Sequence, residues 1–198
     1  MIRPKYTGNR IVILASGGGS NAQCIITYLR DHTTHSVAAI FSNKKSAGVL
    51  EIAEKAGVEN YYSPSKELPT DVLNYVREHK ISAIILAGYL QLIPEELITA
   101  YAGRIINIHP SLLPRYGGKG MYGHHVHQAV LAAKEERSGL TIHLVNKEYD
   151  KGMILCQAMT EVADCKSAEE IAARVLKLEH FHYPRVITQW LDTLNPPV

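Results

Sequence analysis

The sequence predicts an α/β fold, a single Rossmann-like domain with a mostly parallel, helix-covered sheet. Short apolar runs without polar alternation recur through the first half of the chain, and a helical pattern follows each run. Such runs are typical of parallel strands that are buried on both faces. A glycine-rich turn after the first run supports this prediction, because strand-to-helix turns of this kind form ligand sites in open α/β sheets.

The first half of the chain is expected to alternate strand and helix. The predicted strands are 11–15, 37–41, 58–62, 81–87 and 104–109. The predicted helices are 22–30, 47–56, 70–80 with Thr70 as its cap, and 94–101 with Pro94 in its first turn.

The pattern changes after residue 109. Two prolines and four glycines in 110–123 exclude a regular element there. A helix over 125–137, strands over 140–145 and 153–162, and a terminal helix from Ser167 are expected to follow. Ser167 and Glu170 fit a capping box, and Ile171, Val175 and Leu178 form an apolar stripe.

Composition limits the function classes. The 198 residues are 46% hydrophobic and 20% charged, as in ordinary soluble globular proteins. A formal charge of +2 argues against a nucleic-acid or membrane-surface binder, which needs a basic excess. Three widely spaced cysteines predict reduced thiols without a disulfide or zinc site. A polar start over 1–10 and strand-sized apolar runs predict a cytoplasmic protein without a signal peptide or membrane span.

The glycine-rich turn is Ser16-Gly-Gly-Gly-Ser-Asn21. It allows close backbone approach, and the following helix N-terminus favours an anion such as phosphate. A tight turn with Ser20 or Asn21 as N-cap is the structural alternative. Gly17, Gly19 and Ala22 also match a dinucleotide fingerprint, but residues 42–45 hold no acid for the ribose. An NADP-dependent oxidoreductase therefore stays open as a second function.

Asn107 and His109 are the strongest candidates for chemistry. Residues two apart on a strand share a face, so both project together near the carboxyl end of a predicted strand. An amide donor beside a titratable imidazole suits a reaction in which charge develops on a carbonyl oxygen while a proton moves. Asp150, from a predicted turn, is a candidate partner for His109. The alternative is that Asn107 and His109 only cap the strand end and that Asp150 is an ordinary turn residue.

Three further histidines, His124, His125 and His127, do not predict a metal site. They lie at spacings that do not share one helix face, and no carboxylate or cysteine stands at ligand spacing. A solvated helix start is the interpretation that we adopt for them.

Four motifs occur together in a familiar order. They are Ser16-Gly-Gly-Gly-Ser-Asn21, Leu86-Ala-Gly-Tyr-Leu-Gln-Leu-Ile-Pro94, Ile106-Asn-Ile-His-Pro-Ser-Leu-Leu-Pro114 and Asp150-Lys-Gly152. With them the chain resembles the phosphoribosylglycinamide formyltransferases (glycinamide ribonucleotide transformylases) over nearly its whole length after residue 10. The third motif is specific to folate-dependent formyltransferases and their hydrolase relatives.

The resemblance implies a transferase of purine biosynthesis that moves the formyl group of 10-formyltetrahydrofolate to the amine of glycinamide ribonucleotide, without a metal. It implies one formyltransferase domain over 1–198, with a nucleotide-binding half over 10–115 and the remaining strands, active-site loops and C-terminal helix over 116–198. Its partners are small molecules, and the chain is expected to be a monomer or homodimer.

The resemblance also implies roles for individual residues. Asn107, protonated His109 and Asp150 are the catalytic group, with Asp150 stabilising the imidazolium. The ribonucleotide is expected at Gly19, Ser20, Asn21 and Glu179. The folate is expected at Asn107 and at Lys66, Leu90, Gln91, Leu92, Ile93, Asn146, Lys147, Glu148 and Tyr149.

Three departures and two rival activities accompany the resemblance. Gln91 stands where an arginine is common, the stretch over 119–123 is longer than in many relatives, and the segment over 63–70 is shortened. Methionyl-tRNA formyltransferase and formyltetrahydrofolate hydrolase share the chemistry, but each is expected to need an additional domain that a chain of this length does not hold.

Overall fold

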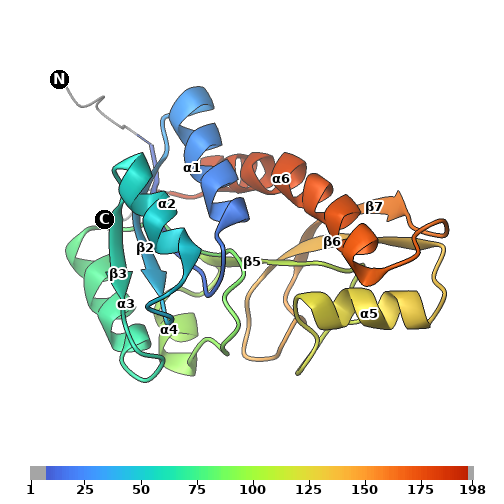
Figure 1. The fold of residues 1–198 in the computed structure, drawn as a ribbon. Helices are drawn as coiled ribbons and strands as arrows, with labels where there is room; N and C mark the ends of the chain where they lie inside the picture. The colour runs from blue at the N-terminus through green and yellow to red at the C-terminus, as the bar shows by residue number, and fades with distance from the viewer. Residues whose placement is uncertain (1–7, 196–198) are drawn as a thin grey trace. The chain divides into compact units, whose positions relative to one another are not determined.

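The computed structural model describes residues 8–195, and Figure 1 shows its helices and strands. The described residues form thirteen helices and strands in two compact units. The first unit is Met1–Gln91 with Ile187–Val198, and the second is Leu92–Val186. Of the polar start predicted to lack a signal peptide, residues 1–7 lie outside the described part.

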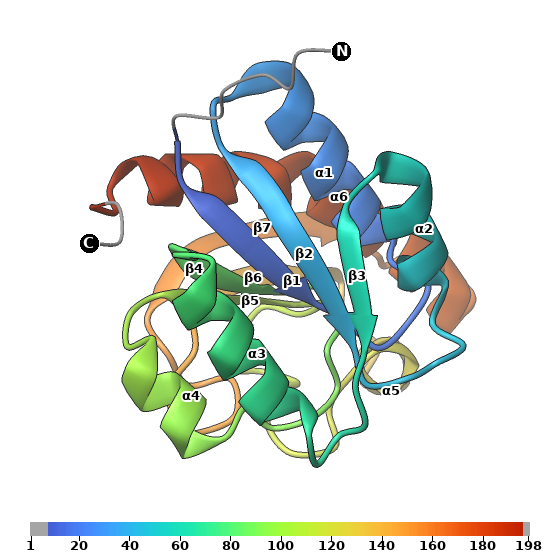
Figure 2. The same cartoon turned by 90° about the vertical axis from the view of Figure 1, so that its left-hand side faces the viewer.

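The first unit holds a parallel sheet in the strand order β3-β2-β1-β4. Figure 2 shows α1 and α2 on one face of these strands and α3 on the other. The central strand β1 is almost fully buried, which explains its unbroken apolar sequence. The helices and strands of the first unit are β1 (Arg10–Leu14), α1 (Ser20–His32), β2 (Ser36–Ser42), α2 (Gly48–Ala56), β3 (Glu59–Tyr62), α3 (Leu68–Glu78) and β4 (Ala83–Leu86).

The second unit holds three antiparallel strands in the order β5-β6-β7. Residues 110–123 contain no helix or strand, as the prolines and glycines predict. The helices and strands of the second unit are α4 (Glu95–Ala100), β5 (Ile105–His109), α5 (His124–Ala132), β6 (Arg137–Leu144), β7 (Ile154–Glu161) and most of α6 (Ala168–Asp192). The predicted α/β class with a mostly parallel sheet is confirmed.

The helix predicted over 125–137 is wrong at its end. Helix α5 ends at Ala132, Lys134 takes a positive φ of 52°, and Arg137 begins β6. Arg137 lies opposite Glu161 of β7, and its guanidinium donates to that carboxylate at 2.9 Å. Pairing with β7 therefore prevails over the helical propensity of the Ala-Lys-Glu segment.

Two smaller differences concern helix starts. Helix α3 begins at Leu68, with Pro69 in its first turn, so Thr70 is not its cap. At the start of α6 the Ser167 hydroxyl accepts the Glu170 N–H at 3.2 Å, as a capping box requires. The Glu170 carboxylate, however, accepts from the backbone of Lys166, one residue earlier than in that motif.

Within the described part of the chain, no helix has the length and apolarity needed to cross a bilayer.

Candidate functional site

The second unit brings polar side chains of two strands onto one face. Asn107 of β5 lies opposite His143 of β6, and His109 lies opposite Thr141. Directly opposed residues of antiparallel strands project to the same side. Asn107 and His109, which the sequence predicts to share a face, therefore stand beside a histidine and a threonine that the sequence analysis did not select.

His143 is almost fully buried and has two defined partners. Its Nδ1 lies 2.9 Å from the carbonyl oxygen of Leu144, and its Nε2 lies 3.1 Å from Nδ2 of Asn107. One feature of the sequence could have indicated it, because His143 is the only titratable residue within the apolar stretch 140–145.

Asp150 lies between the two imidazoles. Its Oδ2 is 3.6 Å from Nδ1 of His109, and its Oδ1 is 3.6 Å from Nε2 of His143. The backbone N–H of Gly118 donates to Oδ2 at 2.8 Å. The carboxylate is 12% exposed and its residue has a positive φ of 55°, so the turn holds it inward. The structure thus brings Asn107, His109 and Asp150 together.

Two glycines make this approach possible. A Cβ at Gly117 would collide with the side chain of Leu113 and lie 3.4 Å from the Cβ of Asp150. A Cβ at Gly152 would overlap the carbonyl oxygen of Leu144, the acceptor for His143. Gly152 has no room for a side chain while the cluster keeps this geometry, and a side chain at Gly117 requires Leu113 to move.

The cluster shifts the pKa values of its members in definite directions. Burial lowers the pKa of His109 and outweighs the opposing effects of Asp150 and of the Tyr116 carbonyl. Burial raises the pKa of Asp150, but His143, His109 and the Gly118 N–H together outweigh it, so the pKa lies below its usual value. Asp150 is therefore a carboxylate at neutral pH, and the His109 ring is neutral.

The ring of His109 is oriented by the segment that follows it. Its Nε2 lies 2.8 Å from the carbonyl oxygen of Tyr116, which can only accept, so Nε2 carries the hydrogen. The hydroxyl of Thr141 donates to the carbonyl of Ser111 and accepts from the N–H of Leu113. The segment after His109 is thus tied to β6.

The glycine-rich turn of the first unit ends in a helix N-terminus without a side-chain cap. Gly19 is the N-cap of α1, with a φ of 84°, so neither Ser20 nor Asn21 caps the helix. A Cβ at Gly19 would lie 2.7 Å from the side chain of Val49, whereas Cβ atoms at Gly17 and Gly18 would meet nothing. The turn therefore leaves open space beside backbone groups at the positive end of a helix, which favours an anion.

Hydrogen bonds connect this turn with two other loops of the same unit. The buried hydroxyl of Ser16 donates to Asn43 at 2.7 Å and accepts the N–H of Leu90 at 3.2 Å. Asn43 in turn donates to Ser65, the neighbour of Lys66. Asn43 directly follows β2, the position at which a dinucleotide site needs an acidic residue. Its side chain instead forms hydrogen bonds with Ser16 and Ser65 of the neighbouring loops.

The residues predicted to line a folate pocket are mostly exposed. Leu90 and Leu92 are 40% and 47% exposed, Gln91 and Lys66 are exposed, and Ile93 is buried. The predicted loop over 146–149 forms a turn in which Asn146 accepts the N–H of Glu148 at 2.9 Å. Exposed Lys147 of this turn forms an ion pair with Glu95 of α4.

Glu179 occupies a buried position on α6. Ile171, Val175, Tyr183 and Ile187 are buried at four- or eight-residue spacing, and Glu179 fills the gap between them with 8% exposure. Leu178, which the sequence analysis placed on the buried stripe, is only half-buried. The hydroxyl of Tyr183 donates to the carbonyl of Ile106 at 3.4 Å, which joins this helix to β5 beside Asn107.

The three histidines of α5 do not all form a solvated helix start, so that prediction is wrong in part. His124 and His125 are exposed, and His124 lies 3.5 Å from Glu169. His127 is only 6% exposed, because it shares the inner side of α5 with Val130.

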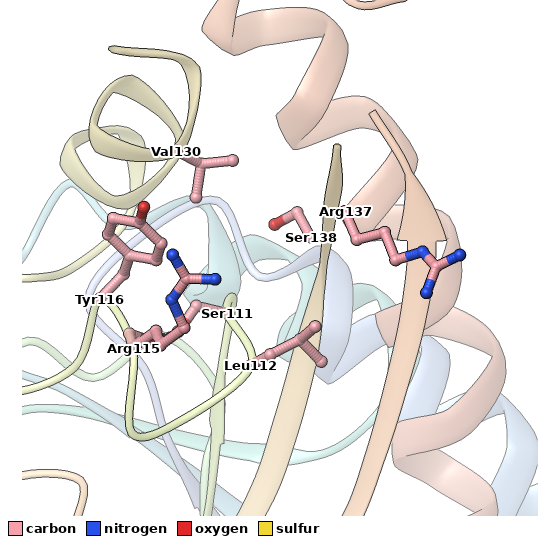
Figure 3. Close-up of a pocket in the computed structure, with 7 residues that line it drawn as sticks. All are labelled: Ser111, Leu112, Arg115, Tyr116, Val130, Arg137 and Ser138. Atoms are coloured by element: carbon pink, nitrogen blue, oxygen red, sulfur yellow. Dashed lines mark hydrogen bonds between the residues drawn. The ribbon is translucent and has the colours of Figure 1, made fainter. Parts of the chain in front are cut away.

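A small cavity elsewhere in the second unit contains none of the predicted site residues (Figure 3). Its volume of about 30 Å³ holds a water or two and excludes a folate or a ribonucleotide. Its two arginines, Arg115 and Arg137, are paired with Glu135 and Glu161. It is therefore not the candidate site.

Comparison with known proteins agrees with this arrangement. The formyl transferase family model matches residues 9–187. A chloroplastic phosphoribosylglycinamide formyltransferase of Arabidopsis thaliana is 40% identical over 90% of this chain, which spans 64% of that protein's length. The Bacillus subtilis phosphoribosylglycinamide formyltransferase is 35% identical, with 94% of this chain and 96% of the relative covered.

Solved structures give the same result. A crystal structure of phosphoribosylglycinamide formyltransferase from Anaplasma phagocytophilum superposes with a TM-score of 0.88 at 30% identity, covering 94% of this chain and 88% of that one. One from Brucella melitensis has a TM-score of 0.85 at 38% identity, covering 97% of this chain and all of that one. These matches confirm the resemblance and replace the oxidoreductase alternative: the chain belongs to the formyltransferase family, among the phosphoribosylglycinamide formyltransferases.

Proposed function

We propose that the chain transfers the formyl group of 10-formyltetrahydrofolate to the amine of glycinamide ribonucleotide, giving formylglycinamide ribonucleotide and tetrahydrofolate. The observation that carries the proposal is the cluster of partly buried Asn107, buried His109 and partly buried Asp150 in a chain of this family. The cluster supplies an amide donor, an imidazole and a carboxylate within reach of one another. Acyl transfer to an amine can use these groups as an oxyanion donor, an acid–base group and an electrostatic partner.

During the reaction one bond to the formyl carbon forms and another breaks. The substrate amine attacks that carbon, and an oxyanion grows on the formyl oxygen. Asn107 donates a hydrogen bond to this oxygen, and His109 does so once it is protonated. The tetrahedral intermediate then collapses, the bond to the folate nitrogen breaks, and a proton from the amine passes to that nitrogen through His109 or a water.

Asp150 has an electrostatic role in this scheme. It is a carboxylate 3.6 Å from the His109 ring, so it stabilises the imidazolium that forms as negative charge grows on the substrate. Burial keeps the free ring neutral, which makes His109 able to accept a proton during the reaction. Loss of one oxyanion donor typically costs about 2.7–4 kcal/mol of transition-state stabilisation.

The remaining predicted residues bind the two substrates. Gly19, Ser20 and Asn21 hold the phosphate of the ribonucleotide at the N-terminus of α1, which the uncapped, open turn supports. Glu179 contacts the ribonucleotide. The folate is bound by Asn107 and by the loops that carry Lys66, Leu90, Gln91, Leu92, Ile93, Asn146, Lys147, Glu148 and Tyr149.

A turnover assay tests the proposal. The protein is incubated with glycinamide ribonucleotide and 10-formyl-5,8-dideazafolate, and deformylation is followed by ultraviolet absorbance. We expect turnover that requires both substrates and collapses in His109→Ala, while His125→Ala, an exposed histidine of α5, keeps it. Absence of turnover in the unmodified protein, or turnover only with NADPH and a carbonyl compound, would refute the proposed activity.

The organisation of the active protein belongs to the same proposal. The chain works on small molecules as a cytoplasmic formyltransferase domain over 1–198, as a monomer or homodimer. Sedimentation with both substrates present, together with cell fractionation, tests these statements.

A further inference from the structure

The environment of His143 determines which of its ring nitrogens carries hydrogen. Nδ1 lies 2.9 Å from the carbonyl oxygen of Leu144. A carbonyl oxygen only accepts, so Nδ1 donates, and in this tautomer Nε2 has a free lone pair. The Oδ1 of Asp150 lies 3.6 Å from Nε2, beyond hydrogen-bond distance, whereas Nδ2 of Asn107 lies within it. The Nε2 atom that carries this lone pair lies 3.1 Å from Nδ2 of Asn107.

The lone pair in turn determines the orientation of the Asn107 amide. An asparagine amide has a donor end and an acceptor end of nearly equal size, and only the donor end can bond to a bare imidazole nitrogen. We propose that His143 is a positioning residue, which fixes the Asn107 amide so that its second N–H, and not its carbonyl oxygen, is presented to the formyl oxygen. This inference rests on the proposed function of Asn107.

Orientation matters because the two amide ends act oppositely on an oxyanion. The N–H group stabilises negative charge on the formyl oxygen, whereas the amide oxygen repels it. Without His143 as its partner, the Asn107 amide can rotate about the last side-chain bond and present either end to the substrate. The cost then falls on the transition state, in which the charge is present, more than on substrate binding.

Gly152 belongs to the same arrangement. A Cβ there would overlap the carbonyl oxygen of Leu144 and lie 3.5 Å from Nδ1 of His143. The absence of a side chain at this position keeps the Leu144 carbonyl where it accepts from the ring. The chain of contacts from Gly152 through Leu144 and His143 ends at Asn107, entirely inside the second unit.

Two substitutions of His143 separate its two contacts. In His143→Gln the amide reaches about as far as Nε2 and can turn its oxygen toward Asn107. In His143→Asn the shorter amide reaches only the position of Nδ1, so the contact with Leu144 is kept and the contact with Asn107 is lost. We expect kcat to fall less than about 10-fold in the first variant and about 10²-fold in the second, with KM within about 3-fold in both.

The decisive comparison repeats His143→Asn in an Asn107→Ala background. Because His143 acts through Asn107, adding His143→Asn to Asn107→Ala should lower kcat by less than about 3-fold. An equal loss in both backgrounds would show that His143 acts on Asp150 or on the substrate directly, and equal damage in the Gln and Asn variants would also overturn the inference.

A measurement on the unmodified protein makes the test independent of folding and of activity. The side-chain ¹⁵N–¹H amide pair of Asn107, assigned by its loss in Asn107→Ala, should show one proton protected from exchange and coupled to the Nε2 of His143. Two equally exposed amide protons would refute the inference, even if the chain proves inactive and the proposed function fails with it.

Discussion

Burial of His127 predicts that the protein loses stability in mild acid. The ring is 6% exposed, and its Nδ1 has no hydrogen-bond partner among the described residues. Burial, followed by repulsion from His124 and His109, lowers the pKa of His127 to about 4. The neutral ring is therefore strongly favoured in the folded chain.

The size and sign of the effect follow from linkage. In the unfolded chain the ring has its ordinary pKa of about 6.5, so as the pH falls the unfolded state binds the proton first. Stability is unaffected well above pH 6.5 and is lost progressively between about pH 6.5 and 4. At about 1.4 kcal/mol per pH unit, this single group destabilises the fold by about 2 kcal/mol at pH 5.

Urea unfolding at pH 7.5 and pH 5.0 measures this contribution. The unmodified protein should lose about 2 kcal/mol more than His127→Gln between the two pH values, because glutamine does not titrate. His125→Gln on the exposed side of the same helix is the matched control and should behave as the unmodified protein does. If His127→Gln loses as much stability as the unmodified protein, the reasoning from burial is wrong.

Three other substitutions test the cluster. Asp150→Asn should lower kcat at least 10²-fold with the calorimetric affinity for glycinamide ribonucleotide within a few-fold, and retained turnover would remove the electrostatic role of that carboxylate. Gly117→Ala should lower the free energy of unfolding in urea by about 1–3 kcal/mol, since its methyl group collides with Leu113. Thr141→Val leaves the carbonyl of Ser111 and a backbone N–H without their partner and should also cost about 1–3 kcal/mol; an unchanged urea midpoint would contradict either estimate.

Part of the candidate site could be predicted because strand geometry is local. The two-residue spacing of Asn107 and His109 places both on one face wherever the strand lies. The glycine-rich turn could be located in the same way, since a strand followed by glycines and a helix is a continuous pattern. Asp150 could be predicted only as a possible partner of His109, because its turn is 41 residues from His109 and no local pattern indicates where its side chain points.

The role of His143 and the burial of His127 could not be predicted, for a different reason. His143 is a lone histidine in an apolar pattern, and such a residue is usually packed without a role. His127 is one of three histidines at a predicted helix start, where solvent exposure is the usual outcome. The register that sets His143 opposite Asn107 depends on how β5 and β6 align, which one sequence does not specify. The burial of His127 likewise depends on what packs against α5.

The antiparallel pairing itself explains why these groups meet. Cβ atoms of directly opposed residues on antiparallel strands lie about 4.5–5.5 Å apart, close enough for the amide of Asn107 to reach the ring of His143. A slip of one residue would place Ile142 or Leu144 opposite Asn107 and turn His143 to the other face. A shift of this kind leaves each side chain intact and still separates the Asn107 amide from its acceptor. The chemistry of the cluster therefore depends on strand register as much as on the identity of its residues.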